Sequence, residues 1–334
     1  MKAVVTTHYG SPPDVLQLTD VATPAPAADE VLIRLHASSV NPLDSFTIRG
    51  PLFFLPKLGR LLKPKHKIAG ADLAGRVESV GRDVQRFRPG DEVFGASFTG
   101  KGLGGFAEFV CAGEDSLAPK PSNLSFEEAA AVPVAAITAL QGLRDQGRIQ
   151  RGQKVLIDGA SGGVGTFAVQ IAKSFGAEVT AVCSPRNVDR ARVIGADHVI
   201  DYTREDFTRS GLRYDLILGA NAHRSIFDYR RALSRDGIFV MVGGGLPRIL
   251  QAVSLGPLLS WIGSKKMRFF IAKINGKDLR LLKDLLEAGK IVPVIDRRYP
   301  LSEVAEAVRY REEGHAQGKV VIAIHRGEDV QGSL

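Results

Sequence analysis

Residues 154–165, with the sequence KVLIDGASGGVG, decide the fold of the middle of this chain. Lys154 to Asp158 is a short apolar run that ends in a turn, which is typical of a buried strand. Glycines follow directly, and from Gly163 to Phe175 the apolar residues recur with the 3.6-residue period of a helix packed on a sheet. A strand, a glycine turn and an amphipathic helix in this order predict the first unit of a parallel α/β sheet.

The glycine turn also predicts a ligand. Ala160, Gly162 and Gly165 fill the three positions of the G-x-G-x-x-G dinucleotide fingerprint, with alanine in the first. A glycine at position 162 lets the backbone approach a pyrophosphate, and the first turn of the helix offers that anion N–H groups without helical partners. We therefore expect four consecutive residues to contact a dinucleotide: Ser161, Gly162, Gly163 and Val164. The alternative is a glycine turn without a ligand.

The end of the second strand indicates which dinucleotide binds. A site that prefers NAD has an acidic residue there, about 20 residues beyond the fingerprint, to bind the ribose hydroxyls. In this chain Ser184 and Arg186 follow the expected strand Glu178 to Cys183, and no acidic residue is present. A hydroxyl and a guanidinium suit a 2′-phosphate, so these two residues predict NADPH. The alternative is that Ser184 caps the next helix and Arg186 is a solvated surface charge.

Strands and helices continue to alternate beyond this unit, which predicts a doubly wound, Rossmann-type NADP-binding domain over residues 125–265. The expected elements are a helix at 187–194, strands at 198–201 and 215–218, a helix at 225–233 and a strand at 238–242.

The first 124 residues have a different composition and pattern, which predict an all-β substrate or catalytic domain. Runs rich in Val, Ile and Phe are broken by Gly, Pro and Asp, which is typical of a barrel or sandwich. The expected strands cover 2–6, 30–36, 75–80, 91–94 and 105–110.

Two further segments connect these domains. Ser125, with Glu128 three residues later, is a capping box that predicts the start of a helix, and the stretch that follows is alanine-rich through Leu143. Residues 266–334 are expected to complete the α/β sheet and return to the first domain, with helices at 278–288 and 302–310 and a strand at 319–324.

Composition narrows the function classes. The 334 residues favour two domains, and the excess of 44 Lys and Arg over 36 Asp and Glu gives a net charge of +8. The basic residues are scattered, with the nearest cluster at 57–67, so we expect an anionic cofactor and no nucleic-acid partner. Cys111 and Cys183 are far apart and form no metal motif, and residues 1–7 lack a signal-peptide core. We therefore expect a reducing, cytoplasmic location.

The segment Leu246 to Ile262 is apolar enough to raise the question of a membrane. Arg248, Gln251 and Pro257 interrupt it, so it falls short of the run that a transmembrane helix requires. Three roles are open for it: a subunit interface, the mouth of the substrate site, or contact with a membrane surface that is at most peripheral.

Several ordered segments resemble one enzyme superfamily. They are NPLDSFTIRG from Asn41, GADLAGRVESVG from Gly70, RPGDEVFG from Arg88, GGFAEF from Gly104, ASGGVG from Ala160, GADHVIDY from Gly195 and GKVVI from Gly318. Together they span nearly the whole chain, which resembles the medium-chain dehydrogenase/reductase superfamily, in particular its zinc-free quinone oxidoreductase branch. The resemblance implies a GroES-like β domain joined to the Rossmann-type domain, and a homodimer formed through the nucleotide-binding domains.

The resemblance also implies roles for individual residues. Tyr202 matches a position beside the adenosine phosphate, and further positions along the cofactor path are matched by Thr138, Gly243, Gly244, Phe270 and Lys319. Asn41 and Asp44 are the implied catalytic residues, Asn41 as a hydrogen-bond donor near the nicotinamide and Asp44 as organiser of its loop. Some relatives have a tyrosine where this chain has Phe46, which leaves water as a candidate proton donor. For Asp44 a purely turn-stabilising role is the alternative.

The implied reaction needs no metal. Where zinc-dependent relatives have a cysteine and a histidine, this chain has Asp44 with Ser45, and Gly70, Ala71 and Asp72. Without a Lewis acid, conjugated acceptors are favoured over simple ketones because they spread the developing charge. We therefore expect an NADPH-dependent reductase that transfers hydride to a quinone or an α,β-unsaturated carbonyl compound. The alternative is an NADPH-binding redox sensor or membrane-peripheral interaction protein with little turnover, attached through Leu52 to Leu62 and Leu246 to Ile262.

Overall fold

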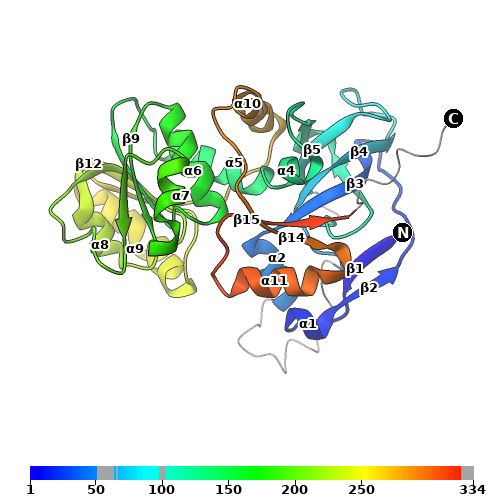
Figure 1. The fold of residues 1–334 in the computed structure, drawn as a ribbon, viewed down its shortest axis with the longest axis horizontal. Helices are drawn as coiled ribbons and strands as arrows, with labels where there is room; N and C mark the ends of the chain where they lie inside the picture. Colours follow the sequence, from blue (N-terminus) through cyan, green and yellow to red (C-terminus); the bar gives the residue numbers. More distant parts are fainter. Residues whose placement is uncertain (51–63, 65–66, 98–102, 325–334) are drawn as a thin grey trace. The chain divides into compact units, whose positions relative to one another are not determined.

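The chain passes between two units, each with its own sheet. The structure is a computed structural model that describes all residues except 51–63, 65–66, 98–102 and 325–334. Unit 1 comprises Met1–Val134, Ile274–Glu287 and Ile295–Leu334, and unit 2 comprises Ala135–Lys273 and Ala288–Val294. The ribbon and its labels are drawn in Figure 1.

Unit 2 is built on a six-stranded parallel sheet in the order β10-β9-β8-β11-β12-β13. The strand order reverses between β8 and β11, which is where doubly wound sheets bind ligands. Its strands are β8 (Lys154–Asp158), β9 (Glu178–Cys183), β10 (His198–Asp201), β11 (Tyr214–Gly219), β12 (Leu233–Met241) and β13 (Lys266–Phe269). Its helices are α5 (Pro133–Gln141), α6 (Gly163–Ser174), α7 (Val188–Val193), α8 (Ile226–Ala232) and α9 (Leu246–Trp261). The Rossmann-type prediction is confirmed.

A buried polar pair lies in the core of unit 2. Tyr229 of α8 stacks on Phe239 of β12 with ring centroids 4.2 Å apart, and its hydroxyl donates a hydrogen bond to Asp158 at the end of β8. Burial raises the pKa of Asp158, and the tyrosine partly offsets the cost of burying this carboxyl group. The pair therefore joins α8 to the strand that leads into the glycine turn.

Unit 1 is built on a mainly antiparallel sheet in the order β14-β15-β3-β4-β5-β7, with β6 paired to β3. Its strands are β3 (Glu30–Val40), β4 (Asp72–Val80), β5 (Glu92–Ala96), β6 (Phe109–Gly113), β7 (Leu117–Pro119), β14 (Ile295–Pro300) and β15 (Lys319–Ala323), beside the hairpin β1 (Lys2–Thr6) and β2 (Leu16–Asp20). Its helices are α1 (Pro12–Val15), α2 (Pro42–Arg49), α4 (Phe126–Ala130), α10 (Gly276–Glu287) and α11 (Val304–Glu312). The strands of this mainly antiparallel sheet confirm the predicted β-rich first domain.

The alanine-rich segment that follows Ser125 forms two successive helices. Ser125 caps α4 as predicted, but α4 ends at Ala130 and α5 begins at Pro133. Proline has no N–H to continue the first helix and favours the first turn of a new one. Because α4 contacts β3 and β4, it belongs to unit 1, and unit 2 begins later than residue 125.

The strand expected at residues 105–110 is also displaced. β6 begins at Phe109, because Gly105 and Phe106 donate their backbone hydrogen bonds to Gly70 and Ala69 and so form a loop contact. Other expected strands are longer than their apolar runs, as in β3, which continues to Val40.

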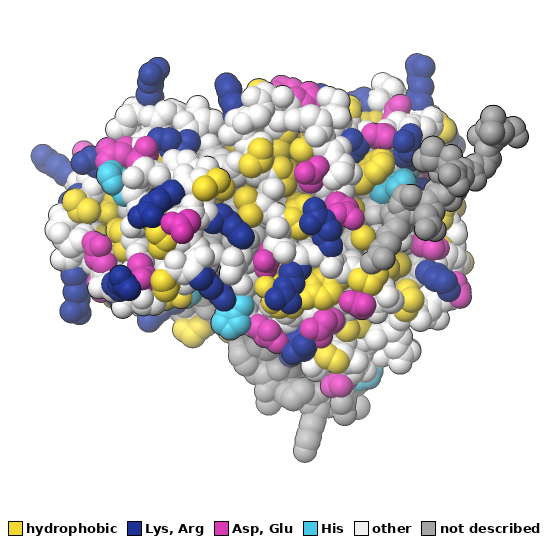
Figure 2. Space-filling view, in the orientation of Figure 1, with side chains coloured by type: hydrophobic (Ala, Val, Ile, Leu, Met, Phe, Trp, Pro, Cys, Tyr) yellow, Lys and Arg dark blue, Asp and Glu magenta, His cyan; other side chains and the backbone are white. Residues whose placement is uncertain are grey.

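The segment Leu246 to Ile262 is helical over almost its whole length, as α9. Within the described residues, no helix is both long enough and apolar enough to cross a bilayer. The Lys57 to Lys67 cluster and the segment Leu52 to Leu62 fall largely outside the described residues. On the face seen in Figure 2, Lys and Arg are interspersed with Asp and Glu.

Candidate functional site

Parallel pairing gathers the predicted cofactor residues of unit 2 at one edge of its sheet. Asp158 pairs with Val182 and with Gly219, Cys183 pairs with Asp201, and Met241 pairs with Phe269. The residues that follow these positions therefore all leave the sheet at its carboxyl edge. They include the glycine turn, Ser184, Tyr202, Gly243 and Phe270.

Three glycines shape the turn between β8 and α6, each for a different reason. Gly159 has a φ of +84°, a conformation that favours glycine, and a Cβ there would lie 2.7 Å from Asn221. A Cβ on Gly165 would lie 2.1 Å from the carbonyl oxygen of Gly159. A Cβ on Gly162 would meet only that same oxygen, at 3.7 Å. Gly162 thus leaves open space beside the turn, which fits the close approach of a ligand.

The start of α6 can bind an anion. Gly162 is its N-cap and supplies no side-chain cap; its own amide donates to Gly159 at 3.3 Å, and the amide of Thr166 donates to Gly162 at 2.9 Å. The amides of the first helical turn between them precede the first helical hydrogen bond. Residues 161–164 are half-buried, so their backbone is reachable from solvent. Phe167 and Ile171 are fully buried and fix the helix on the sheet. A pyrophosphate therefore fits this N-terminus.

Ser184 and Tyr202 lie next to each other at the same edge. They follow the paired residues Cys183 and Asp201, and the amide of Tyr202 donates to the Cys183 carbonyl at 3.3 Å. Ser184 precedes the short turn Pro185–Asn187 without capping it through its side chain, so its expected alternative role as a cap is not seen. Its Oγ instead accepts a 2.9 Å hydrogen bond from Nδ2 of the buried Asn187. The Ser184 proton is then directed to another acceptor.

The remaining predicted residues of unit 2 occupy distinct places. Gly243 and Gly244 follow β12, and a Cβ on either would come within 2.6 Å of a backbone oxygen. Phe270 follows β13 and is half-buried, as is Thr138 on α5. Arg186 is exposed and Tyr202 is 51% exposed, as groups that receive a ligand from solvent should be.

Unit 1 contains a buried polar network centred on Asp72, the first residue of β4. Its Oδ2 accepts hydrogen bonds from Ser39 Oγ at 2.5 Å, Asn41 Nδ2 at 2.8 Å and Lys319 Nζ at 3.1 Å. Its Oδ1 accepts one from the amide of Val134 at 2.8 Å. The side chains of Asp72 and Lys319 are 0% and 3% exposed, so this is a buried ion pair with its hydrogen-bonding capacity well used.

The same network fixes both predicted catalytic residues. Asn41 Oδ1 accepts from Lys319 at 2.7 Å, and Asn41 Nδ2 donates to Asp72 and, at 3.3 Å, to the Ser39 carbonyl. Both amide protons of Asn41 therefore have acceptors within unit 1. Lys319, expected on the cofactor path, lies here and donates to Val40 as well, at 3.4 Å.

Asp44 organises the loop at the start of α2. Its Oδ2 accepts from the Asn41 amide at 2.7 Å and its Oδ1 from the Gly70 amide at 3.1 Å. Burial raises the pKa of Asp44 to about 7, the nearby Asp72 adds to this, and the two backbone hydrogen bonds and Lys319 oppose it. The contacts match the loop-organising role expected for Asp44, and its titration near neutral pH makes it an acid or base candidate.

Sequence reasoning missed two residues of these sites. It gave Asp72 no role beyond replacing a metal ligand, although a lone acid in the apolar run from Gly70 to Gly75 was a signal of a buried, paired carboxylate. It also placed Ala160 in the first fingerprint position, whereas Gly159 makes the left-handed turn. Among the described residues, no three His, Cys, Asp or Glu side chains form a cluster suited to a metal ion.

Comparisons with known proteins agree with both units. Residues 27–122 match the model of the alcohol dehydrogenase GroES-like domain, and residues 194–322 match that of the zinc-binding dehydrogenase family. The chain is 33% identical over 332 residues to the chloroplastic quinone-oxidoreductase QR1 of Triphysaria versicolor, covering 96% of this chain and 98% of that protein. It is 37% identical over 335 residues to the 2-methylene-furan-3-one reductase of Solanum lycopersicum, covering 96% and 79%.

Solved structures agree with these sequence relatives. The quinone oxidoreductase of Coxiella burnetii superposes with a TM-score of 0.85 at 32% identity, covering 97% of this chain and 99% of that one. A GroES-like β domain joined to a doubly wound sheet with a glycine turn defines the class of alcohol-dehydrogenase-like oxidoreductases. The chain belongs to the medium-chain dehydrogenase/reductase superfamily, and to its quinone oxidoreductase-like branch.

The glycine turn gives a first prediction. Gly165→Ala should lower the free energy of unfolding by about 1–3 kcal/mol or more, because the new Cβ overlaps the Gly159 carbonyl. Gly162→Ala is the matched variant: it should fold with nearly wild-type stability but bind dinucleotide roughly ten-fold more weakly or worse, since its Cβ occupies the ligand's side of the turn. Denaturant unfolding and calorimetric titration measure the two effects. Equal dinucleotide affinity in Gly162→Ala and wild type would contradict the assignment.

The buried carboxyl of Asp44 gives a second prediction. The folded state keeps this proton up to about pH 7, whereas the unfolded chain releases it near pH 4. The folded state therefore binds more protons in this window, and its stability should fall as pH rises, by roughly 1 kcal/mol per pH unit.

An Asp44→Asn variant should lack this fall. Its unfolding free energy should therefore rise relative to that of wild type between about pH 4 and pH 7. The exposed Asp14→Asn is the control and should follow wild type. Denaturant-induced unfolding, measured at several pH values across this range, gives the difference in unfolding free energy. Parallel curves for wild type and Asp44→Asn would show that Asp44 does not titrate there.

Proposed function

We propose that the protein is an NADPH-dependent reductase that transfers hydride to a quinone or an α,β-unsaturated carbonyl compound without a metal ion. The family membership makes it an oxidoreductase with a nicotinamide cofactor. The observation that carries the choice of cofactor is the edge after β9, where residues 184–188 include Ser184 and Arg186 and no acid.

The residues at this edge fit a phosphorylated dinucleotide. The α6 N-terminus and the open space at Gly162 accommodate the pyrophosphate. Ser184 accepts from Asn187 and so has its own proton available for a phosphate oxygen, and Arg186 is exposed beside it. An acid at the same place would repel a 2′-phosphate.

The acceptor class rests on chemistry and on the relatives. Bound NADPH would supply the hydride. Two of the relatives are named for a quinone and for 2-methylene-furan-3-one, both conjugated carbonyl compounds. Such acceptors spread the added charge onto oxygen, so they need less electrostatic support than a simple ketone.

The proposed role of unit 1 follows from its hydrogen bonds. Lys319 and Asp72 hold the Asn41 side-chain amide, and Asp44 binds the backbone amides of Asn41 and Gly70. Phe46 has no hydroxyl, so we propose water as the source of the proton that completes the reduction. Homodimer formation and the cytoplasmic location remain predictions.

The direct test is turnover by the purified protein. We expect NADPH oxidation with quinones and alkenals, little oxidation with NADH, and no loss of rate after treatment with a chelator. Alcohol oxidation that a chelator abolishes would overturn the metal-free assignment. Tight NADPH binding without turnover on any acceptor would favour the alternative of a redox-sensing protein.

The cofactor preference gives a separate prediction. Arg186→Ala should raise the KM for NADPH about ten-fold to a hundred-fold with little change for NADH, because one charge-assisted contact to the 2′-phosphate is lost. Arg190→Ala, a basic residue one helical turn further along, is the control. An unchanged NADPH to NADH ratio in Arg186→Ala would remove the argument for NADPH.

A further inference from the structure

Helix α9 exposes an almost wholly apolar face. Leu250 is 60% exposed, Val253 51%, Leu258 52% and Trp261 84%. At the helical repeat these positions lie on one side, together with the other exposed positions of the helix. We define the α9 face as Leu246, Pro247, Leu250, Val253, Ser254, Pro257, Leu258 and Trp261, followed by the exposed Ile262.

The one polar side chain of this face has its donor satisfied within the helix. Ser254 Oγ donates to the Leu250 carbonyl at 2.7 Å. Removing water from the face therefore leaves no unpaired Ser254 proton. The face contains no charged residue, so nothing on it resists transfer to an apolar environment.

The opposite side of α9 already fulfils the structural role of the helix. Ala252 is buried in the core of unit 2, and Ile249, Leu255 and Leu259 pack against that core. A helix that is apolar on both sides is stabilised when each side contacts an apolar environment. The α9 face therefore does not contribute to the core of unit 2. Exposed apolar patches of this kind mark contact surfaces.

The charge around the face identifies the partner. Residues 237–272 contain no Asp or Glu, but four basic residues: Arg248, Lys265, Lys266 and Arg268. Arg230 of α8, which contacts α9, adds another cation at the end of the helix, where its guanidinium donates to the Ile262 carbonyl at 2.6 Å.

These cations are bound to neutral carbonyl groups and keep their net charge. Lys265 donates to the Arg230 carbonyl at 2.8 Å, Lys266 to the Ser260 carbonyl at 2.9 Å and Arg248 to the His223 carbonyl at 2.9 Å. In the described part of the chain no carboxylate pairs with them. Burial and the nearby Arg230 and Arg213 lower the pKa of Lys265, which agrees with crowded positive charge.

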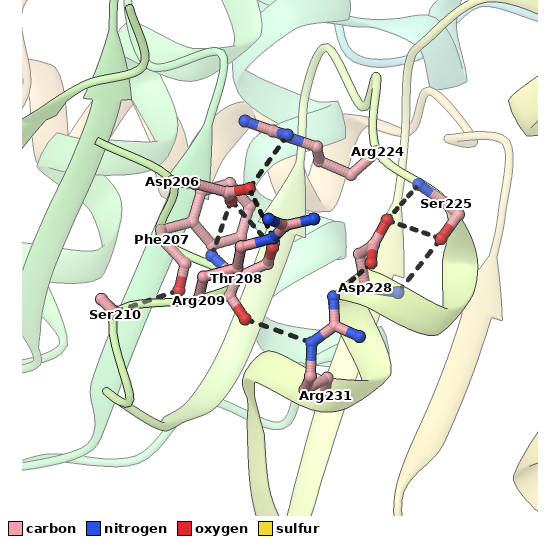
Figure 3. A network of polar contacts seen from close by, with 9 residues as sticks. All are labelled: Asp206, Phe207, Thr208, Arg209, Ser210, Arg224, Ser225, Asp228 and Arg231. Atoms are coloured by element: carbon pink, nitrogen blue, oxygen red, sulfur yellow. Dashed lines mark hydrogen bonds and ion pairs between the residues drawn. The ribbon is translucent and has the colours of Figure 1, made fainter. Parts of the chain in front are cut away.

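Figure 3 shows arginines of unit 2 that, unlike the cations beside α9, pair with carboxylates. There Arg224 pairs with Asp206 at 3.2 Å and Arg231 pairs with Asp228, so those arginines are neutralised within the chain. The cations beside α9 lack such partners among the described residues, which leaves them available to an external anionic surface.

We propose that the α9 face docks on an anionic lipid bilayer, with α9 lying in the membrane interface and the surrounding lysines and arginines on the lipid headgroups. An apolar helix face beside a basic border is the pattern of interfacial binding. A second copy of this chain fits less well, because a two-fold contact through this face would bring the same cations against one another. The length and composition of α9 permit surface contact and no span.

Trp261 makes the proposal directly measurable, since it is the only tryptophan in the chain. With vesicles containing about 30% phosphatidylserine, its emission should move to shorter wavelength and be quenched by brominated lipid chains. Pure phosphatidylcholine vesicles should bind much more weakly, and raising the salt from about 0.05 M to about 0.5 M should reverse binding to the anionic vesicles. Unchanged emission at saturating anionic lipid would overturn the proposal.

Variants separate the apolar and the charged parts. Leu250→Glu should weaken vesicle binding about ten-fold or more, and Lys265→Gln with Lys266→Gln roughly ten-fold to thirty-fold. Val193→Glu, an equally apolar and 84% exposed position on α7, should bind like wild type. NADPH turnover should be unchanged in all of them, which distinguishes this proposal from the proposed function. A dimer in sedimentation that Leu250→Glu dissociates, without vesicle binding by wild type, would overturn membrane docking in favour of a second copy.

Discussion

The burial of the Asp72 carboxylate constrains unit 1 more than any other interaction. An unpaired charge at this depth would destabilise the fold by several kcal/mol, so the chain must bring partners to it. They come from both ends of the sequence: Ser39 and Asn41 from the end of β3 and Lys319 from β15. The C-terminal segment returns to the first sheet and places β15 beside β3, which is what allows this pair to form.

This constraint links stability to the proposed chemistry. Lys319 joins Asn41 to Asp72, and the Asn41 amide in turn bonds to Asp44 at the start of α2. None of these side chains is free to change its hydrogen bonds independently of the others, because each buried donor or acceptor left unpaired is costly. The loop from Asn41 to Asp44 is therefore preorganised by the core of the β unit itself.

Backbone geometry shapes the candidate site in unit 2, whereas buried side-chain charges organise the one in unit 1. The parallel register aligns the ends of β8, β9, β10, β11 and β12, and glycines at the turn remove side chains where a phosphate must approach. In the same unit, α9 presents an exposed apolar face with basic neighbours. One small domain thus has a polar edge suited to a nucleotide and a separate surface suited to a lipid interface.

The sequence by itself determined the class of fold and predicted where a dinucleotide binds. The glycine turn, the Ser125 capping box and the alternating strands and helices are local patterns whose physics acts within a few residues, so they were predictable. The tertiary structure alone decided that β6 begins at Phe109 and that α9 has an exposed apolar face. It also decided that Lys319 meets Asp72 across 247 positions of sequence. Such contacts depend on which strands become neighbours, and no periodicity or spacing in one sequence specifies the partner of a buried charge.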